Sequence, residues 1–397
     1  MYPPHDLGGG YELTWRAAVA RLRAAGHDLR VLTTDYRRPE LEGAPEDPDV
    51  HRELRWYWRD HRWPRLGPRA CLGIERHNAA ALDRHLAAVS PDVVNWWAMG
   101  GMSLSLIERV RRAGIPAVGV VGDDWLRYGP GVDGWLRKLR RVPGPLATLV
   151  ERASGVPVRV DLDAGGFWLF NSETTRRRAA ESGLALPAAG VAHPGIDHEL
   201  FRRAPAPPWR WRLLYVGRID ARKGVDTAIG ALPSLPPEAT LAVVGGGDED
   251  HLRELRELAE RLGVASRVSF GRAPREELPG VYADADVLVF PVRWEEPWGL
   301  VPLEAMAVGV PVVATGAGGS GEYLAHEDNC LLFSPRDGRE ALAAAVRRLA
   351  GDEDLRGRLR EAGLHTAARF DRRDYERAIE EAVERAPELT RAPAGLR

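Results

Sequence analysis

This sequence has few cysteines and almost no net charge. The 397 residues include only Cys71 and Cys330, whose separation matches no metal-ligand pair and no redox motif, so a disulfide framework or a zinc knuckle is disfavoured. The formal net charge is only -2, so no general attraction to nucleic acid or to an anionic membrane is expected. An anionic ligand must therefore be held by a local group of residues.

Long hydrophobic runs are absent as well. No stretch of about 18 apolar residues occurs, and the N-terminus has neither a signal-peptide pattern nor a transit pattern. We expect a soluble or peripheral protein of the cytoplasm, with the inner face of the membrane as an alternative location. Lysine is rare too: Lys138 and Lys223 are the only two, which draws attention to the place of each.

What the chain does contain is a regular alternation of short β-rich apolar runs and amphipathic helical stretches. This alternation is typical of parallel sheets covered by helices. It occurs in two series, which predict an α/β protein of two Rossmann-like doubly wound domains facing each other across a cleft. The strands predicted for the first series are 29–34, 92–96, 116–121 and 167–170. The strands predicted for the second series are 213–216, 240–244, 267–270, 286–290 and 311–314.

A proline-rich stretch, residues 203–209, separates the two series and has the stiff, extended character of an interdomain linker. We therefore expect domains at 1–203 and 210–370, followed by a C-terminal helix at 371–397 that packs back on the first domain. A doubly wound domain normally opens with a buried strand, yet glycines 8–10 follow almost directly after the start. Either the start is assigned too late or the first domain lacks a central strand.

Residues 213–227 place basic groups at the carboxyl edge of a predicted strand, where open α/β sheets bind ligands. The strand ends in Gly217, and Arg218 and Lys223 lie in the loop that leads to the next helix. A guanidinium and an ammonium beside helix-terminal N–H groups suit a diphosphate. The alternative is that the loop lies at the surface and its basic residues bind no ligand.

A glycine-rich turn, residues 245–247, follows the next predicted strand. The backbone of Gly246 can approach a nucleotide because no side chain intervenes, although a tight turn explains the glycines about as well. The dinucleotide fingerprint G-x-G-x-x-G fails here, because Asp250 stands where the third glycine is required. It fails in the N-terminal loop too, where Leu13 takes that place. A nicotinamide-dependent oxidoreductase is thereby disfavoured.

The stretch EEPWGLVPLE, residues 295–304, places two carboxylates around the expected start of a helix near Leu300. Glu296 then lies in the preceding loop and Glu304 early in the helix. Carboxylates accept hydrogen bonds from hydroxyls, so the pair suits two hydroxyl-bearing groups, with a phosphate at the helix N-terminus between them. Helix capping explains the spacing equally well, so the residues alone leave both interpretations open.

Five stretches of the sequence carry a resemblance to a known family. They are EEPWGLVPLEAMAVGVPVVAT from Glu295, GGSGE at Gly318–Glu322, YVGRIDARKG at Tyr215–Gly224, VAHPGID at Val191–Asp197, and the opening GGGYE…GHDLRVLTT. Together they resemble the retaining family 4 glycosyltransferases over nearly the whole chain. The resemblance implies the GT-B fold, with an acceptor-binding N-terminal half and a donor-binding C-terminal half. It also implies hexosyl transfer from a UDP- or GDP-linked sugar to a carbohydrate, lipid-linked or small-molecule acceptor.

The resemblance further implies roles for single residues. Arg218 and Lys223 would contact the donor diphosphate, and Glu304 the ribose hydroxyls. Glu296 would contact the transferred sugar. The other expected donor-binding positions are Gly9, Gly10, Gly217, Gly246, Trp298, Gly299 and Leu300. No cofactor beyond the nucleotide sugar and no metal are expected, because none of the D-x-D tripeptides or His/Asp groupings makes a convincing metal site.

The first domain departs from the family pattern at one point. Members often carry a His-Asp pair after the strand at 117–121, whereas this chain has Gly122 followed by Asp123. Asp123 is therefore the expected polar group near the sugar, and a solvated loop acid is the alternative. The next segment, residues 125–141, is aromatic and basic, which suits sugar stacking, an anionic acceptor, a membrane surface or ordinary packing of a helix.

The reaction that the resemblance implies needs no protein nucleophile. The acceptor would attack the face that the leaving group vacates, a phosphate oxygen would take its proton, and domain closure would exclude water. The competing hypotheses are a nucleotide-sugar epimerase or hydrolase or a phosphorylase of the same fold, and a non-catalytic sugar-binding relative. No nucleic-acid partner is expected. The sequence leaves open the donor base and sugar, the acceptor and the oligomeric state.

Overall fold

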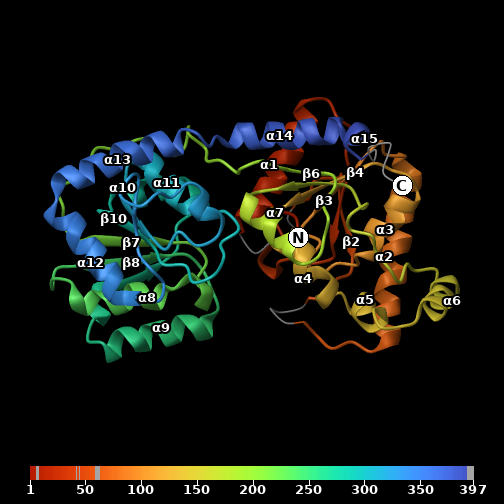
Figure 1. The fold of residues 1–397 in the computed structure, drawn as a ribbon, viewed down its shortest axis with the longest axis horizontal. Coiled ribbons are helices and arrows are strands. Elements are labelled where there is room, and N and C mark those ends of the chain that lie inside the picture. The colour runs from red at the N-terminus through yellow and green to blue at the C-terminus, as the bar shows by residue number, and fades with distance from the viewer. Residues whose placement is uncertain (6–8, 42, 44, 59–62, 391–397) are drawn as a thin grey trace. The chain divides into compact units, whose positions relative to one another are not determined.

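The computed structural model describes residues 1–5, 9–41, 43, 45–58 and 63–390. The chain forms two compact units, each built on parallel strands (Figure 1). Unit 1 comprises Met1–Ala192 and the segment from Glu376 onward, and unit 2 comprises His193–Tyr375. Among the described residues, no helix is long and apolar enough to cross a membrane. Both cysteines are buried and free.

Unit 1 contains a four-stranded parallel sheet in the order β3-β4-β5-β6 and a separate parallel pair, β1-β2. The strands are β1 (Val31–Thr34), β2 (Val50–Leu54), β3 (Val94–Trp97), β4 (Ala117–Val121), β5 (Phe167–Phe170) and β6 (Ala189–Val191). The helices are α1 (Gly10–Ala24), α2 (Pro68–Val89), α3 (Ser105–Arg112), α4 (Trp125–Val132), α5 (Gly134–Leu139), α6 (Gly144–Ser154), α7 (Glu173–Glu181), α15 (Ala386–Leu389) and most of α14 (Arg372–Glu384).

Strand β4 lies between two neighbours, and its sequence Ala-Val-Gly-Val-Val is buried at every position, as expected for a parallel strand covered on both faces. Glycine is required in its middle because a Cβ on Gly119 would lie 2.2 Å from the Trp168 ring. The Trp168 ring in turn packs edge-on against Trp125, with 5.5 Å between the ring centroids. Buried aromatic side chains therefore fix the β4–β5 pair, and the carboxyl end of β4 leads into the loop that carries Asp123.

No strand precedes α1 in the described residues, where a doubly wound domain would have its first strand. The β1–β2 pair and the β3–β6 sheet are not paired with each other. Tyr2 packs edge-on against Trp15 at 4.9 Å, in an apolar cluster that includes Val31 and Val50. Side-chain packing, rather than strand pairing, holds the described N-terminal residues to unit 1.

Unit 2 contains a six-stranded parallel sheet in the order β9-β8-β7-β10-β11-β12. This is the 3-2-1-4-5-6 order of the doubly wound fold, in which the strand order reverses between the first and fourth strands. The strands are β7 (Arg212–Val216), β8 (Thr240–Val244), β9 (Val268–Gly271), β10 (Val287–Phe290), β11 (Val312–Ala314) and β12 (Leu331–Leu332). The helices are α8 (Val225–Ala231), α9 (Glu249–Arg261), α10 (Leu278–Ala283), α11 (Leu300–Val308), α12 (Gly338–Gly351) and α13 (Glu353–Ala367).

The proline-rich stretch at 203–209 belongs to unit 2, so the structure does not place the interdomain link there. The Ala204 N–H donates to the Val308 carbonyl at 3.0 Å, and Arg360 on α13 donates to the Ala204 carbonyl. The Arg356 guanidinium lies over the Trp209 ring at 5.3 Å. The boundary between the units falls at Ala192/His193 instead. The sequence could not show this, because Arg360 lies 156 residues beyond the segment that it anchors.

The segment expected to return to the first domain begins within α14. Residues from Glu376 onward are part of unit 1. Arg21 on α1 donates to Glu380 on α14 at 2.6 Å, and Ala386 on α15 is buried. This contact joins the two ends of unit 1, which lie 359 residues apart.

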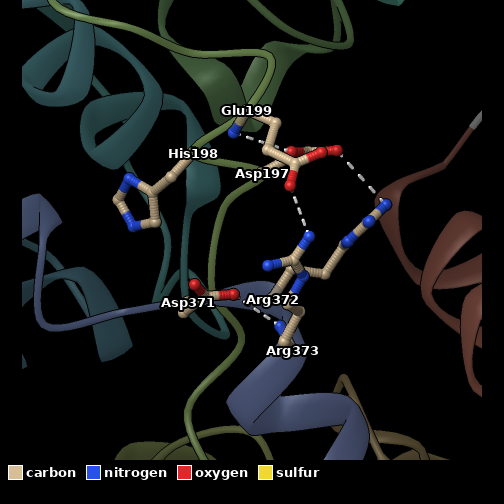
Figure 2. Close-up of a pocket in the computed structure, with 6 residues that line it drawn as sticks. All are labelled: Asp197, His198, Glu199, Asp371, Arg372 and Arg373. Carbon is tan, nitrogen blue, oxygen red and sulfur yellow. Dashed lines mark hydrogen bonds and ion pairs between the residues drawn. The ribbon is translucent and has the colours of Figure 1, made fainter.

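A small pocket lies where two segments of unit 2 run side by side (Figure 2). The Ile196 N–H donates to the Phe370 carbonyl at 3.1 Å, and the Arg372 N–H donates to the Ile196 carbonyl at 3.0 Å. The pocket is lined by Asp197, His198, Glu199, Asp371, Arg372 and Arg373. Two ion pairs, of 3.4 Å and 2.5 Å, join its two guanidinium groups to two of its three carboxylates. We assign this pocket a structural role, because it joins the two segments.

Candidate functional site

The strand order of unit 2 reverses between β7 and β10, and open α/β sheets bind ligands outside the carboxyl ends of the strands at such a point. Lys223 lies in the loop after β7, and Glu296 lies in the loop after β10. The Lys223 Nζ donates to Glu296 Oε2 at 2.6 Å, although the two residues are 73 positions apart. The structure thus brings two of the predicted residues together where the fold favours a ligand.

Trp294 completes this group. Its Nε1–H donates to the same oxygen of Glu296 at 2.8 Å, and its ring lies 4.4 Å from the Arg222 guanidinium. The side chains of Lys223 and Glu296 are only 14% and 11% exposed. Partial removal from water strengthens the electrostatic interactions of both groups. A ligand at this edge therefore meets a cation and a carboxylate that are already oriented.

Two close backbone contacts hold these loops together. Gly224 has a φ of +72°, and a Cβ there would lie 2.0 Å from the Pro291 carbonyl oxygen, so glycine lets the loop after β7 approach the end of β10. Gly318 has a φ of +74°, and its Cβ would lie 2.4 Å from the Glu296 nitrogen. The Glu296 carbonyl also accepts from the Gly319 N–H at 2.6 Å. The GGSGE segment therefore fixes the main chain of Glu296.

Arg218 has a different environment. Its side chain is 62% exposed, and its Nε donates to Asp220 Oδ2 at 3.1 Å. Asp220 also accepts from Arg222, so one carboxylate partly neutralises two guanidinium groups. An exposed guanidinium in this position can turn toward an anionic ligand by rotation of its side chain alone.

The three glycines after β8 differ in what surrounds them. A Cβ on Gly245 would lie 1.9 Å from the Gly217 carbonyl oxygen, and a Cβ on Gly247 would lie 2.1 Å from another main-chain oxygen. These contacts pack the loop after β8 on the loop after β7. A Cβ on Gly246 meets only the guanidinium of Arg272, at 3.4 Å. The packing of the chain therefore requires glycine at positions 245 and 247, whereas position 246 has room for a larger residue.

This difference predicts that alanine at position 245 affects stability, whereas alanine at position 246 affects nucleotide binding. Gly245→Ala should lower the free energy of unfolding by about 1 to 3 kcal/mol, because its Cβ overlaps a main-chain oxygen. Gly246→Ala should leave thermal unfolding nearly unchanged but weaken the binding of UDP or GDP by roughly tenfold, which titration calorimetry would measure. Unchanged nucleotide binding by Gly246→Ala would show that the nucleotide does not approach this glycine.

Helix α11 begins at Leu300, directly after Gly299, whose φ of +88° favours glycine. The first amides of a helix have no partner within the helix and favour an anion. The Trp298 side chain is buried, because its Nε1–H donates to the Pro194 carbonyl at 2.8 Å and its ring stacks on His193 at 4.4 Å. Any contact of Trp298 with a ligand must therefore come from its backbone.

Glu304 lies early in α11 and is almost completely buried. Its Oε2 accepts from the Tyr282 hydroxyl at 2.9 Å, and its Oε1 forms an ion pair with Arg275 Nη1 at 3.0 Å. Burial raises the pKa of Glu304, and the positive charge of Arg275 opposes that rise. Because the Arg275 side chain is 39% exposed and that of Glu304 only 4%, Arg275 separates this carboxylate from the solvent.

In unit 1, Asp123 lies in the loop after β4. Its carboxylate accepts from the Tyr128 hydroxyl and from the Trp125 N–H, both at 3.0 Å. Burial raises the pKa of Asp123 to about 6, although both hydrogen bonds act to lower it. The Tyr128 ring packs on Gly100, where a Cβ would lie 2.2 Å from the hydroxyl. Asp123 is thus a half-buried carboxyl group that two hydrogen bonds hold in place.

Gly122, which stands where the family often has histidine, faces Tyr11. A Cβ on Gly122 would lie 2.6 Å from the Tyr11 ring. The Tyr11 hydroxyl donates to the Val120 carbonyl and accepts from the Ala98 N–H at 3.1 Å, which fixes the ring in place. Tyr11 therefore occupies the space that a side chain at position 122 would need.

Gly9 and Gly10 form the start of α1. A Cβ on Gly9 would meet only the flexible Glu12 carboxylate, at 2.1 Å, and a Cβ on Gly10 would meet nothing within 4 Å. The packing of unit 1 thus does not require glycine at position 10. A role of Gly9 and Gly10 in donor binding stays a prediction.

Among the residues of unit 1 that the structure describes, two groups of potential metal ligands occur, and the sequence did not indicate either of them. In the first, His85 Nε2 lies 3.1 Å from the Glu53 carboxylate, and His51 is beside them. Arg84 donates to Glu53 at 2.7 Å and Arg30 lies 3.3 Å from His85, so positive charges that oppose a metal ion already surround this group. The second group consists of His27, Glu380 and Glu384. The absence of a functional metal stays a prediction.

Sequence reasoning missed four side chains that hold the predicted residues in place. Trp294 holds Glu296, and its position next to the two glutamates was a signal for it. Arg275 and Tyr282 hold Glu304. They precede β10 in the chain and Glu304 follows it, so no short sequence motif links the three residues. Tyr128 holds Asp123 and lies in the aromatic segment that the sequence had already singled out.

The comparisons with known sequences agree with this geometry. The family model for glycosyl transferases group 1 matches residues 197–366. A GDP-mannose-dependent alpha-(1-6)-phosphatidylinositol monomannoside mannosyltransferase of Mycobacterium tuberculosis is 38% identical over 47% of this chain, and the match spans about half of that relative, 52%. Glycogen synthase of the same organism is 31% identical over 88% of this chain and 84% of its own. The chain therefore belongs to the group 1 glycosyltransferases.

Solved structures confirm the predicted fold. Anabaena HepE, in complex with UDP and glucose, has a TM-score of 0.70 at 20% identity and covers 96% of this chain and 98% of its own. Sucrose-phosphate synthase from Thermosynechococcus elongatus has a TM-score of 0.71 at 21% identity, with coverages of 96% and 94%. At such low identity the likeness shows the fold alone, which is GT-B.

Proposed function

We propose that this protein transfers a hexosyl group from a UDP- or GDP-linked sugar to a hydroxyl of an acceptor, with retention at the anomeric carbon and without a metal ion. The observation that carries the proposal is the pair of Lys223 and Glu296 at the strand reversal of unit 2. The ammonium suits a phosphate and the carboxylate suits sugar hydroxyls. The bond that breaks in a nucleotide sugar joins the sugar to the diphosphate. Glu296 suits the sugar side of this bond, and Lys223 suits the diphosphate side.

The rest of the donor would lie along the same sheet edge. Gly246 would leave room for the nucleotide, and Glu304 would accept from the ribose hydroxyls once Arg275 moves aside. One relative is named as GDP-mannose-dependent, and HepE is solved with UDP, so both nucleotides are candidates for this chain. We propose a carbohydrate, a lipid-linked molecule or a small metabolite as the acceptor.

In the proposed reaction the bond from the anomeric carbon to the diphosphate oxygen breaks, and a bond to the acceptor oxygen forms on the same face. Lys223 and Arg218 would stabilise the charge of the departing diphosphate, with a contribution from the N-terminus of α11. The acceptor proton would pass to a phosphate oxygen. Because these cations supply the positive charge, the reaction would not need a metal ion. Asp123, which belongs to unit 1, would orient a hydroxyl of the sugar.

A panel of UDP-glucose, UDP-N-acetylglucosamine, GDP-mannose and the free nucleotides tests this proposal. At 100 times its dissociation constant, the true donor should stabilise the folded protein by about 2.7 kcal/mol, measured by thermal unfolding. With an acceptor present, NMR should show a retained anomeric configuration, and EDTA should not stop turnover. An inverted product would exclude the mechanism. Turnover without acceptor would indicate an epimerase or hydrolase, and binding without turnover a non-catalytic relative.

A further inference from the structure

Helix α6 of unit 1 turns its large apolar side chains outward. Leu146 and Leu149 are 54% and 62% exposed, and as residues three apart they share one face of the helix. Ala147 is the only residue of α6 that is buried. Figure 1 shows α6 standing out from the sheet and helices of its unit. This face therefore has no partner within the described residues of the chain.

The exposure of this face does not come from a loosely attached helix. Arg76 on α2 donates to the Ser154 carbonyl at 3.0 Å and to the Ala153 carbonyl at 3.2 Å. Glu151 forms an ion pair with Arg112 on α3 and accepts from the Val158 N–H at 3.0 Å. These contacts fix the C-terminal half of α6, so the two leucines are held in an outward position.

The segment that leads into α6 is strongly basic. Lys138, Arg140 and Arg141 are exposed, and none of them forms an ion pair with a residue that the structure describes. The Arg159 guanidinium lies against Gly144 at the start of α6 and is exposed as well. The chain as a whole has a net charge of -2, so this concentration of unpaired positive charge is a local feature. We call these four basic residues together with Leu146 and Leu149 the α6 patch.

We infer that the α6 patch binds the surface of an anionic membrane. A short amphipathic helix with exposed leucines and flanking basic residues matches the way in which a protein lies at the boundary between lipid headgroups and acyl chains. Basic residues near such a surface gain from its negative potential. Two leucines on one helix face offer far less apolar area than the roughly 800 Å² per partner of a stable protein interface, which favours lipid over a second copy of the chain.

Binding of vesicles by the full-length protein tests this inference, which goes beyond the proposed function and does not depend on it. The protein should sediment with vesicles of equal parts phosphatidylcholine and phosphatidylglycerol, and much less with phosphatidylcholine alone. The double variant Arg140→Gln/Arg141→Gln should reduce the partition coefficient for the anionic vesicles by roughly 30-fold, because each basic residue contributes about fivefold. Leu146→Ser/Leu149→Ser should also reduce it.

The matched control is Arg253→Gln/Arg261→Gln on α9, which removes the same charge from exposed positions of unit 2 and should leave vesicle binding unchanged. Equal sedimentation with neutral vesicles, or no effect of the α6 variants, would overturn the inference. A dimer in sedimentation velocity that the leucine variant dissociates would assign the patch to contact between copies instead. Binding of UDP and GDP by the same variants tests the proposed function separately. Vesicle binding can persist even if the protein binds neither nucleotide and transfers no sugar.

Discussion

Replacing Lys223 by alanine should lower kcat/KM for sugar transfer by roughly 100- to 1000-fold, the usual cost of removing one charge-stabilising donor from an active site. Lys223 Nζ is the cation at the strand reversal of unit 2, and its 2.6 Å contact with Glu296 fixes it there. The loss should fall mainly on kcat, because the charge on the leaving diphosphate increases in the transition state. Initial rates at varied donor concentration would measure it.

Two controls distinguish this effect from a damaged fold. Lys138→Ala removes the only other lysine of the chain, from an exposed position in unit 1, and should leave transfer to a soluble acceptor unchanged. Lys223→Ala alone leaves the largely buried Glu296 carboxylate without its cation, which costs stability. The double variant Lys223→Ala/Glu296→Gln should recover the thermal stability but not the activity. Full activity in Lys223→Ala would show that the site is assigned wrongly.

Replacing Glu304 by glutamine should weaken donor binding by at least about 100-fold, because two hydrogen bonds from ribose hydroxyls to a charged carboxylate are lost. Stability should change little. The glutamine can still accept from the Tyr282 hydroxyl, and the substitution removes a carboxylate whose charge burial disfavours. Titration calorimetry with the matching nucleotide and thermal unfolding would measure the two effects separately. Normal nucleotide affinity would limit Glu304 to its contacts with Arg275 and Tyr282.

The pH dependence of stability gives an independent control for Glu304. Because burial raises its pKa, the folded protein binds this proton more tightly than the unfolded chain does. The contribution of Glu304 to the free energy of unfolding should therefore fall as the pH rises above about 4.3, the value for an unperturbed glutamate. The stability of the wild type relative to Glu304→Gln should fall in the same direction. No trend would mean that the carboxylate is not desolvated.

Nine of the twelve strands in the described residues were predicted from the sequence, each to within two residues of its observed bounds, whereas β2, β6 and β12 were not. Buried parallel strands are short apolar runs between breakers, which is a local signal. The order of the strands was not predictable. The pairing of Val287 with Leu213 and of Leu288 with Leu214 joins segments that no motif connects. The proline-rich stretch shows the same limit, because its anchor on α13 comes much later in the chain.

The residues of the candidate site were also chosen from local patterns, by chemistry and by resemblance. The sequence placed Lys223 and Glu296 at the carboxyl ends of two separate strands. It could not show that these strands are neighbours, nor that the two side chains meet at 2.6 Å. It named Gly246 as a donor-binding position but could not show that packing requires glycine at positions 245 and 247 and not at 246. Nor could it show that Tyr11 fills the space beside Gly122.

The sequence by itself determined the α/β class, the positions of most of the strands, the family and the types of side chain available to a nucleotide sugar. These depend on apolar periodicity and on short motifs, which are properties of neighbouring residues. Only the tertiary structure decided which carboxylate meets the lysine, which one is buried behind Arg275, and which leucines of α6 remain exposed. These outcomes depend on pairing and burial between segments far apart in the chain, and no local pattern encodes such contacts.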